Sequence, residues 1–256
     1  MQVFHGLNHL PTLGRVAATV GSYDGVHVGH RTLLAHLKRE AERIGGQSLV
    51  ITVSPHPRRA LDPMCEMRLL TSTEEKSRLI EEEGIDYLLV IPFDRPFSRT
   101  EPAEFIRLLV EQLGVESLVV GYDHRFGHNK SGGKELLAEL QQAGKLSITE
   151  VPEQEVNQEH LSSTAIRRLI EKGEMLHAAR LLGTGYRLDG DLNEEGIFTP
   201  CEPHKLLPPA GSYRVFAEGY PTEMPLHLTI DSKATITLQG IPAPKQGAWR
   251  LRFEEE

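Results

Sequence analysis

The chain has 256 residues, 39% of them hydrophobic, so it can bury one sizeable core and a small second one. A formal net charge of −8 argues against general nucleic-acid binding, which depends on clustered lysine and arginine. The sequence contains no secretion signal and no apolar run that spans a bilayer, and its two cysteines lack partners at motif spacing. We therefore expect a soluble, cytoplasmic protein with reduced thiols and no membrane partner.

Strands and helices alternate along the first two-thirds of the chain. Short apolar runs favour strands, and apolar residues at helical spacing favour helices. In chain order we expect a strand at 16–20, a helix at 31–44, a strand at 48–53, a helix at 71–83, a strand at 86–91, a helix at 101–113, a strand at 117–120, a helix at 134–143, a strand at 146–151 and a helix at 161–172. This order predicts a Rossmann-like, doubly wound α/β fold with a five-stranded parallel sheet.

The composition changes after Leu182. Glycines and prolines separate short β-rich stretches, which we predict as strands at 212–217, 226–230 and 234–238. We expect two domains, an α/β domain over residues 1–182 and a small antiparallel β-rich domain over residues 183–256. The sequence does not indicate an oligomeric state.

The first predicted strand and helix are joined by residues 21–30, with the sequence GSYDGVHVGH, here called the glycine turn. Free backbone N–H groups and the helix dipole make such a turn favourable for phosphate. His27 and His30 stand three residues apart, and Gly29 lets a ligand approach the backbone. Imidazole donates hydrogen bonds to phosphate oxygens. The His-x-Gly-His pattern is typical of small nucleotidyltransferases; zinc ligation lacks a second ligand group at matching spacing, and two ordinary surface histidines remain an alternative.

Three further loops carry polar and charged side chains. They are residues 54–59 (SPHPRR), 121–133 (GYDHRFGHNKSGG) and 162–168 (SSTAIRR). Each has an ordinary interpretation when taken alone: a proline-stiffened turn, a surface loop and a helix cap. Because right-handed crossovers bring such loops to one edge of a parallel sheet, we expect all three to line one crevice with the glycine turn.

Together these motifs resemble the bacterial bifunctional riboflavin kinase/FAD synthetase family, in its N-terminal FMN adenylyltransferase domain. The resemblance rests on the glycine turn, Pro55-His56-Pro57, residues 121–127 and residues 162–167, in the family's order. It implies transfer of AMP from ATP to FMN, giving FAD and pyrophosphate. ATP and FMN would be the substrates, and Mg²⁺ would be held mainly by phosphate oxygens, with no dedicated protein ligands.

The resemblance also implies roles for individual residues. The expected catalytic residues are His27, His30 and Arg167. The expected ATP-binding residues are Gly21, Ser22, Tyr23, Asp24, Gly29, Asp123, Ser163 and Thr164, and the expected FMN-binding residues are His56, Pro57 and Arg125.

In the same family the C-terminal position holds a riboflavin kinase barrel. Its Gly-Phe-Pro-Thr-Ala-Asn stretch, which serves magnesium and phosphate, is replaced here by residues 196–201 (GIFTPC). We therefore expect a barrel-like remnant without riboflavin kinase activity. Three alternatives remain open: a nucleotidyltransferase acting on another phosphate-bearing acceptor, a non-catalytic flavin- or nucleotide-binding protein, and a bifunctional enzyme in which Thr199 substitutes for the missing motif.

Overall fold

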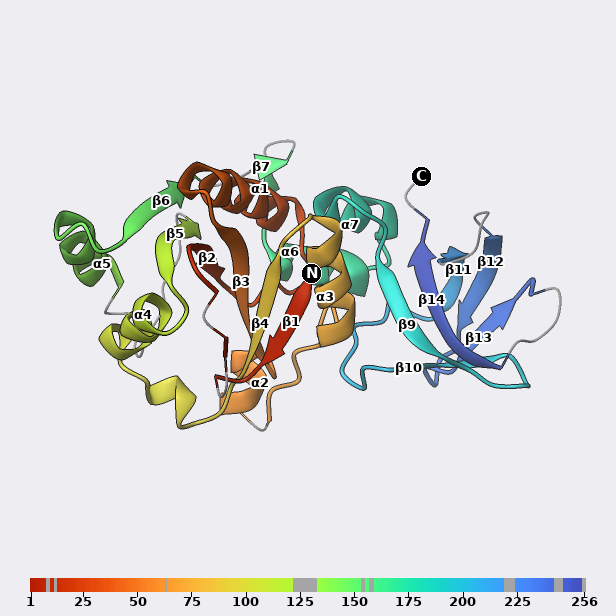
Figure 1. The fold of residues 1–256 in the computed structure, drawn as a ribbon. Coiled ribbons are helices and arrows are strands. Elements are labelled where there is room, and N and C mark those ends of the chain that lie inside the picture. The colour runs from red at the N-terminus through yellow and green to blue at the C-terminus, as the bar shows by residue number, and fades with distance from the viewer. Residues whose placement is uncertain are drawn as a thin grey trace. The chain divides into compact units, whose positions relative to one another are not determined.

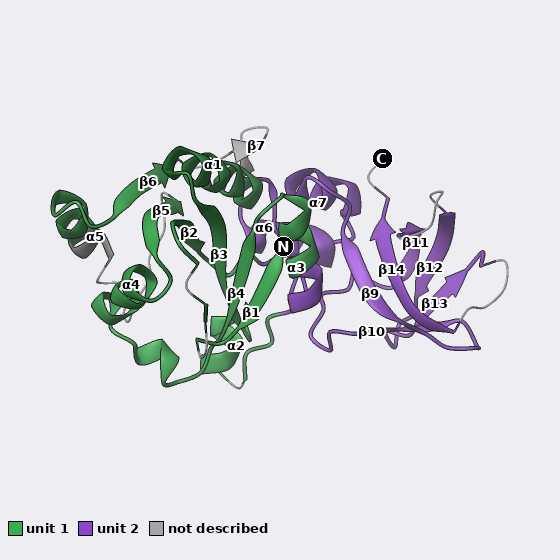
Figure 2. Ribbon diagram, viewed as in Figure 1, with its two compact units in different colours: residues 1–23, 29–67, 77–154 green, residues 24–28, 68–76, 155–256 purple. Residues whose placement is uncertain are grey.

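The computed structural model describes residues 1–7, 10–11, 13–62, 64–121, 133–152, 155–156, 159–218, 224–241 and 246–254. Contacts divide the chain into two compact units (Figure 2). Unit 1 contains residues 1–23, 29–67 and 77–154, and unit 2 contains residues 24–28, 68–76 and 155–256. Two short segments from the first third of the chain thus belong to unit 2. The domain boundary expected after residue 182 stays a prediction.

Unit 1 is built on a six-stranded parallel sheet with the order β1-β4-β3-β2-β5-β6 (Figure 1). The strands are β1 (Gln2–His5), β2 (Val16–Val20), β3 (Gln47–Ser54), β4 (Tyr87–Pro92), β5 (Val115–Gly121) and β6 (Ser147–Val151). The Rossmann-like fold is confirmed, with six strands instead of five. β1 was not predicted, because this four-residue edge strand, QVFH, is largely exposed and has no apolar run.

Helices connect these strands. They are α1 (Val28–Ile44), α2 (Pro57–Leu61), α3 (Thr73–Glu82), the 3-10 helix η1 (Phe97–Arg99), α4 (Pro102–Glu111) and α5 (Gly133–Gln142). Phe105, Ile106 and Leu109 of α4 pack into the core of the sheet. The short helix α2 corrects our expectation of a loop at residues 54–59. Pro57 suits a first helical turn, and His56 caps it by accepting a 3.3 Å hydrogen bond from the Arg58 N–H.

The strand order reverses between β2 and β5. From β2 the chain proceeds to β3 and β4 on one side, whereas β5 and β6 lie on the other side. In open parallel sheets, ligands bind outside the carboxyl ends of the strands at such a reversal point. The glycine turn leaves the sheet there, because β2 ends at Val20.

Unit 2 contains a closed antiparallel barrel with the ring order β10-β13-β12-β11-β14-β9. Its strands are β9 (Arg187–Leu192), β10 (Ile197–Pro200), β11 (Gly211–Ala217), β12 (Met224–Ile230), β13 (Ile236–Gln239) and β14 (Gly247–Phe253). The unit also contains the strand pair β7 (Glu155–Val156) and β8 (Glu159–His160), and the helices α6 (Ser163–Glu171) and α7 (Met175–Leu182).

Alternating side chains fill the barrel. Leu226, Leu228 and Ile230 of β12 are buried, as are Trp249 and Phe253 of β14. Buried residues of α6 and α7 pack against the same core. The barrel confirms the expected β-rich C-terminal part, whereas β9, β10, β14 and α7 were not predicted. In β9, for example, the sequence RLDGDL offers only two apolar side chains. Among the described residues, no helix is long and apolar enough to cross a membrane.

Candidate functional site

The glycine turn has an unusual backbone. Tyr23, Gly25 and Val26 have φ angles of 49°, 88° and 40°. These lie in the left-handed region of backbone conformation, which residues other than glycine rarely adopt. A β-branched residue such as Val26 is especially unfavourable there. Strained backbone of this kind persists only where surrounding contacts hold it, and it is most common at functional sites.

The helix that follows the glycine turn is suited to an anion. α1 has 17 residues, and Gly29 and His30 lie in its first turn. That turn contains no acidic side chain. Its N–H groups and the helix dipole therefore present positive partial charge at the reversal point of the sheet.

Tyr23 and His30 pack together in unit 1. The Tyr23 hydroxyl lies 2.7 Å from the Thr19 hydroxyl, and its ring contacts the His30 ring with the centroids 5.0 Å apart. Gly21 has no side chain where a Cβ atom would lie 2.9 Å from the Tyr23 ring. Burial raises the pKa of Tyr23 far above its usual value, so its hydroxyl stays neutral. These contacts fix the orientation of the His30 ring.

His27 belongs to unit 2 and is buried, with 7% of its surface exposed. Burial lowers the pKa of His27 to about 4, and the negative charge of Asp24 opposes this shift only in part. The imidazole is therefore neutral at pH 7. It can donate one hydrogen bond, but it carries no positive charge.

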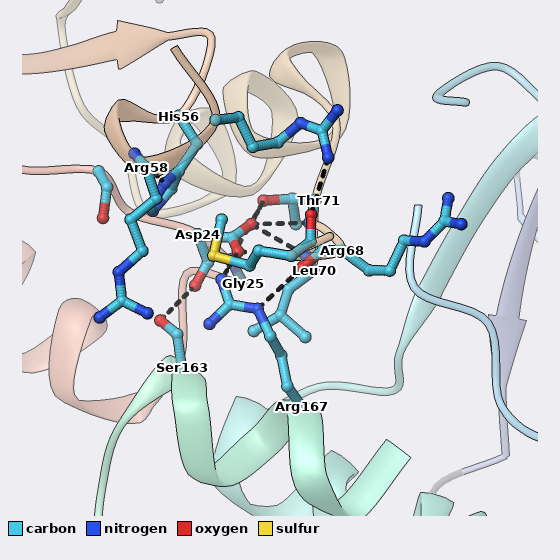
Figure 3. Close-up of polar contacts among 12 residues, drawn as sticks. Asp24, Gly25, His56, Arg58, Arg68, Leu70, Thr71, Ser163 and Arg167 are labelled. Carbon is cyan, nitrogen blue, oxygen red and sulfur yellow. Dashed lines mark hydrogen bonds and ion pairs between the residues drawn. The ribbon is translucent and has the colours of Figure 1, made fainter. Parts of the chain in front are cut away.

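Asp24 is the centre of a buried group of contacts in unit 2 (Figure 3), here called the Asp24 cluster. Its carboxylate, in a residue with 2% of its surface exposed, accepts hydrogen bonds from the Leu70 and Thr71 N–H groups at 3.0 Å each. The Thr71 hydroxyl lies 3.1 Å from the same oxygen. The other carboxylate oxygen forms an ion pair with the Arg167 guanidinium. Asp24 thus anchors residues 24–28 to segment 68–76 and to α6 within unit 2.

Two residues of α6 complete the Asp24 cluster. The Nε of Arg167 donates to the Arg68 carbonyl at 2.9 Å, which fixes the plane of the guanidinium. The Ser163 hydroxyl donates to the Asp24 carbonyl at 2.9 Å. The neighbouring Ser162 is the N-cap of the helix. The three hydroxyls at this helix start therefore differ in their contacts: Ser162 caps the helix, Ser163 contacts Asp24, and Thr164 is exposed.

The predicted site residues fall into two groups. Unit 1 contains Gly21, Ser22, Tyr23, Gly29, His30, His56 and Pro57, and unit 2 contains Asp24, His27, Ser163, Thr164 and Arg167. Within unit 2, the structure brings Asp24, Ser163 and Arg167 into direct contact. Asp123 and Arg125 follow β5 and lie outside the described residues.

Segment 68–76 contributes to the site, although its sequence predicted only a helix start. It supplies the Leu70 and Thr71 N–H groups, the Thr71 hydroxyl and the Arg68 carbonyl to the Asp24 cluster. A local signal was present, because Ser72 and Glu75 have the spacing of a capping box. That signal predicts only the start of a helix, which is all that we expected there.

The comparisons with known proteins identify the family. The FAD synthetase family model matches residues 11–165. A protein of Listeria monocytogenes named FAD synthetase is 34% identical over 200 residues, which cover 77% of this chain and 79% of the relative. The chain belongs to the FAD synthetase family.

Other relatives are named bifunctional riboflavin kinase/FMN adenylyltransferase. One from Listeria monocytogenes is 34% identical over 172 residues, which cover 67% of this chain and 54% of the relative. One from Escherichia coli K12 is 34% identical over 187 residues, which cover 73% of this chain and 59% of the relative. The chain thus spans between half and two-thirds of the length of these bifunctional relatives of the FAD synthetase family.

A solved structure has the same fold. The crystal structure described as a macrolide-efflux protein from Streptococcus pneumoniae superposes with a TM-score of 0.85, over 99% of this chain and 89% of that chain. The two sequences are 20% identical, so this likeness shows the fold alone. It includes the barrel as well as the FAD synthetase part of the chain.

Proposed function

We propose that this member of the FAD synthetase family transfers AMP from ATP to FMN, giving FAD and pyrophosphate, and does not phosphorylate riboflavin. The observation that carries the proposal is the family match over residues 11–165, which includes the whole glycine turn and reaches the first turn of α6. An FMN phosphate oxygen would attack the α-phosphorus of ATP. As the new P–O bond forms, the bond from the α-phosphorus to the bridging oxygen breaks and pyrophosphate leaves.

The glycine turn would bind the triphosphate. First-turn N–H groups of α1 would donate to phosphate oxygens, with support from the helix dipole. His27 and His30 would donate hydrogen bonds to the α- and β-phosphates. Because His27 is neutral at pH 7, it would act as a fixed donor in a buried environment, where such donors stabilise developing charge most strongly.

Residues of α6 would bind the leaving pyrophosphate. Arg167 uses its Nε and Nη2 atoms on the Arg68 carbonyl and Asp24, so its guanidinium is oriented by the protein itself. Its further N–H groups would donate to phosphate oxygens, together with the backbone N–H of Ser163 at the helix start and with Thr164. An arginine held in this way loses little conformational freedom when it binds the nucleotide.

The remaining assignments are Asp123, Gly21, Ser22 and Tyr23 for ATP, and His56, Pro57 and Arg125 for FMN. The order of the sheet supports this division, because the loops after β2, β3 and β5 leave the same edge. Among the described residues, no three His, Cys, Asp or Glu side chains could together hold a metal ion. Mg²⁺ would be bound by nucleotide phosphates and water, which suits its coordination preferences. The free thiols of Cys65 and Cys201 suit the cytoplasm.

The loss of riboflavin kinase activity is supported by β10, which occupies the position of the kinase motif. Phe198 is buried in the barrel core, and a Cβ atom on Gly190 would lie only 2.4 Å from its ring. The adjacent Thr199 is exposed. In register with the kinase motif, Phe198 stands at the proline position and Thr199 keeps the threonine, whereas Cys201 replaces the asparagine that would serve magnesium and phosphate.

Incubation with ATP, Mg²⁺ and either FMN or riboflavin tests both parts of the proposal. We expect FAD from FMN, and neither FMN nor FAD from riboflavin, when the products are separated by chromatography. Absence of FAD at every protein concentration would reject FMN as the acceptor and favour another phosphate-bearing acceptor. Formation of FMN from riboflavin would show that kinase activity persists.

His30→Ala distinguishes an enzyme from a non-catalytic binder. If His30 stabilises the transition state, the variant should lose more in kcat than in ATP affinity. His36→Ala, on the same helix, is the matched control and should change neither. A wild-type protein that binds ATP and FMN without turnover would support the binding-protein alternative.

A further inference from the structure

A buried ion pair joins segment 68–76 to the barrel within unit 2. Lys205 lies between β10 and β11, and Glu75 lies in the first turn of α3. Their charged atoms are 2.5 Å apart, and the side chains expose only 2% and 1% of their surfaces. Removing two charges from water is so unfavourable that well-packed apolar side chains often stabilise a fold better. The pair therefore calls for an explanation other than stability.

Each partner of the ion pair makes further contacts. The Glu75 carboxylate accepts hydrogen bonds from the Ser72 N–H at 2.8 Å and from the Asp189 N–H of β9 at 2.9 Å. The Lys205 ammonium donates to the Leu70 carbonyl at 2.7 Å and lies over the Tyr186 ring, 4.5 Å from its centroid. Segment 68–76 is thus held by groups on two separate parts of the barrel chain.

The backbone adds a second connection. The Leu69 N–H donates to the His204 carbonyl, and the Leu206 N–H donates to the Leu69 carbonyl, both at 2.8 Å. Leu69 and Lys205 consequently pair as a parallel β-bridge. Segment 68–76 is aligned beside the barrel by this pairing, and the ion pair sets the position of the residues that follow.

The other side of the same segment carries the Asp24 cluster. Leu70 joins the two sides directly, because its carbonyl accepts from Lys205 and its N–H donates to Asp24. Any displacement of the Leu70 backbone therefore changes the position of the Asp24 carboxylate, and with it the position of the Arg167 guanidinium.

We propose that Lys205 and Glu75 are positioning residues for adenylyl transfer, and that the barrel serves this reaction by holding the Asp24 cluster through segment 68–76. The inference rests on the proposed function for its kinetic consequences. It explains why a barrel that lacks the kinase motif still carries a buried lysine directed at Leu70. Preorganised groups lose much of their effect after small displacements, so the pair should influence rate as well as folding.

Lys205→Met tests this role, with Leu228→Ala as the control. Leu228 is fully buried in the barrel core but belongs to neither the ion pair nor the Asp24 cluster, so its truncation weakens apolar packing without removing a contact of either. We expect Lys205→Met to lower kcat/KM for ATP by about 10- to 100-fold. We also expect amide hydrogen exchange at Leu70 and Thr71 to be at least about tenfold faster. Leu228→Ala should change neither quantity.

A second variant covers the case in which Lys205→Met does not fold. Glu75→Gln/Lys205→Met removes both buried charges together, which avoids an unpaired carboxylate. We expect this double variant to fold and to keep the kinetic defect and the faster exchange. Normal kinetics and exchange in a folded variant would overturn the proposal, as would equal defects in Leu228→Ala. Failure of both variants to fold would also overturn it, since the pair would then act on the fold alone.

The exchange measurement separates this inference from the proposed function. If wild-type protein forms no FAD, adenylyl transfer to FMN is rejected. Exchange at Leu70 and Thr71 still reports whether Lys205 positions the Asp24 cluster.

Discussion

Asp24→Asn should strongly destabilise unit 2. The substitution keeps the size of the side chain but removes its charge, and it turns an amide NH₂ toward groups that themselves donate. The Leu70 and Thr71 N–H groups already share one carboxylate oxygen at 3.0 Å each, so the amide NH₂ would take the place of the oxygen that faces Arg167. Arg167, with 9% of its surface exposed, loses its ion-pair partner. Breaking a buried ion pair from one side lowers the free energy of unfolding by about 3–5 kcal/mol.

Urea unfolding monitored by the fluorescence of Trp249 measures this loss. Trp249 is the single tryptophan of the chain and is buried in the barrel core of unit 2. With an m-value of about 3 kcal/mol/M, the expected loss lowers the urea midpoint by roughly 1 to 1.7 M. The same measurement on Arg167→Met gives the other single variant of a double-mutant cycle, in which the two substitutions should be far from additive.

Asp231→Asn is the matched control for this experiment. Asp231 is an exposed aspartate of unit 2 whose carboxylate accepts the Lys233 and Thr235 N–H groups at 2.8 Å each. Because water can replace these hydrogen bonds, we expect a much smaller loss than in Asp24→Asn. An equal loss in Asp24→Asn and Asp231→Asn would refute the view that burial and the ion pair make Asp24 special.

Two further predictions concern the glycine turn. Burial lowers the pKa of His27 from 6.5 to about 4, so the unfolded chain takes up the proton first as the pH falls. The free energy of unfolding should then decrease by up to about 3 kcal/mol between pH 7 and pH 4. The decrease should be smaller in His27→Gln, and an equal dependence of the unfolding free energy on pH in the two proteins would contradict this. Gly25 has a φ of 88°, and a Cβ atom there would lie 2.8 Å from Leu70, whereas Gly45 has a φ of 62° and open space. In thermal unfolding, the free energy of unfolding should fall by about 1–2 kcal/mol in Gly45→Ala and by about 2–4 kcal/mol in Gly25→Ala. Equal losses in the two variants would exclude an effect of the Leu70 contact.

Local patterns predicted the part of the site that is built from neighbouring residues. The apolar run of β2 matches its predicted bounds, and α1 begins three residues before the predicted start. The glycines between them indicated a turn at the carboxyl end of a strand. Such elements depend on side-chain periodicity and backbone preference, both of which are visible in a short window.

The partners of Asp24 were not predictable in the same way. Leu70 is 46 residues away and Arg167 is 143 residues away along the chain. No periodicity records such a contact, and Arg167 was expected to face phosphate rather than to contact Asp24. The neutral state of His27 has the same origin, because its pKa is set by burial within the folded unit.

The interleaved order of the two units has a consequence for the nascent chain. Asp24 leaves the ribosome 143 residues before Arg167, and Glu75 leaves 130 residues before Lys205. At about 5–20 residues per second, roughly 7 to 30 s pass before Asp24 can meet its ion-pair partner. During translation Asp24 therefore exists without its ion-pair partner until Arg167, about two-thirds of the way along the polypeptide, has emerged.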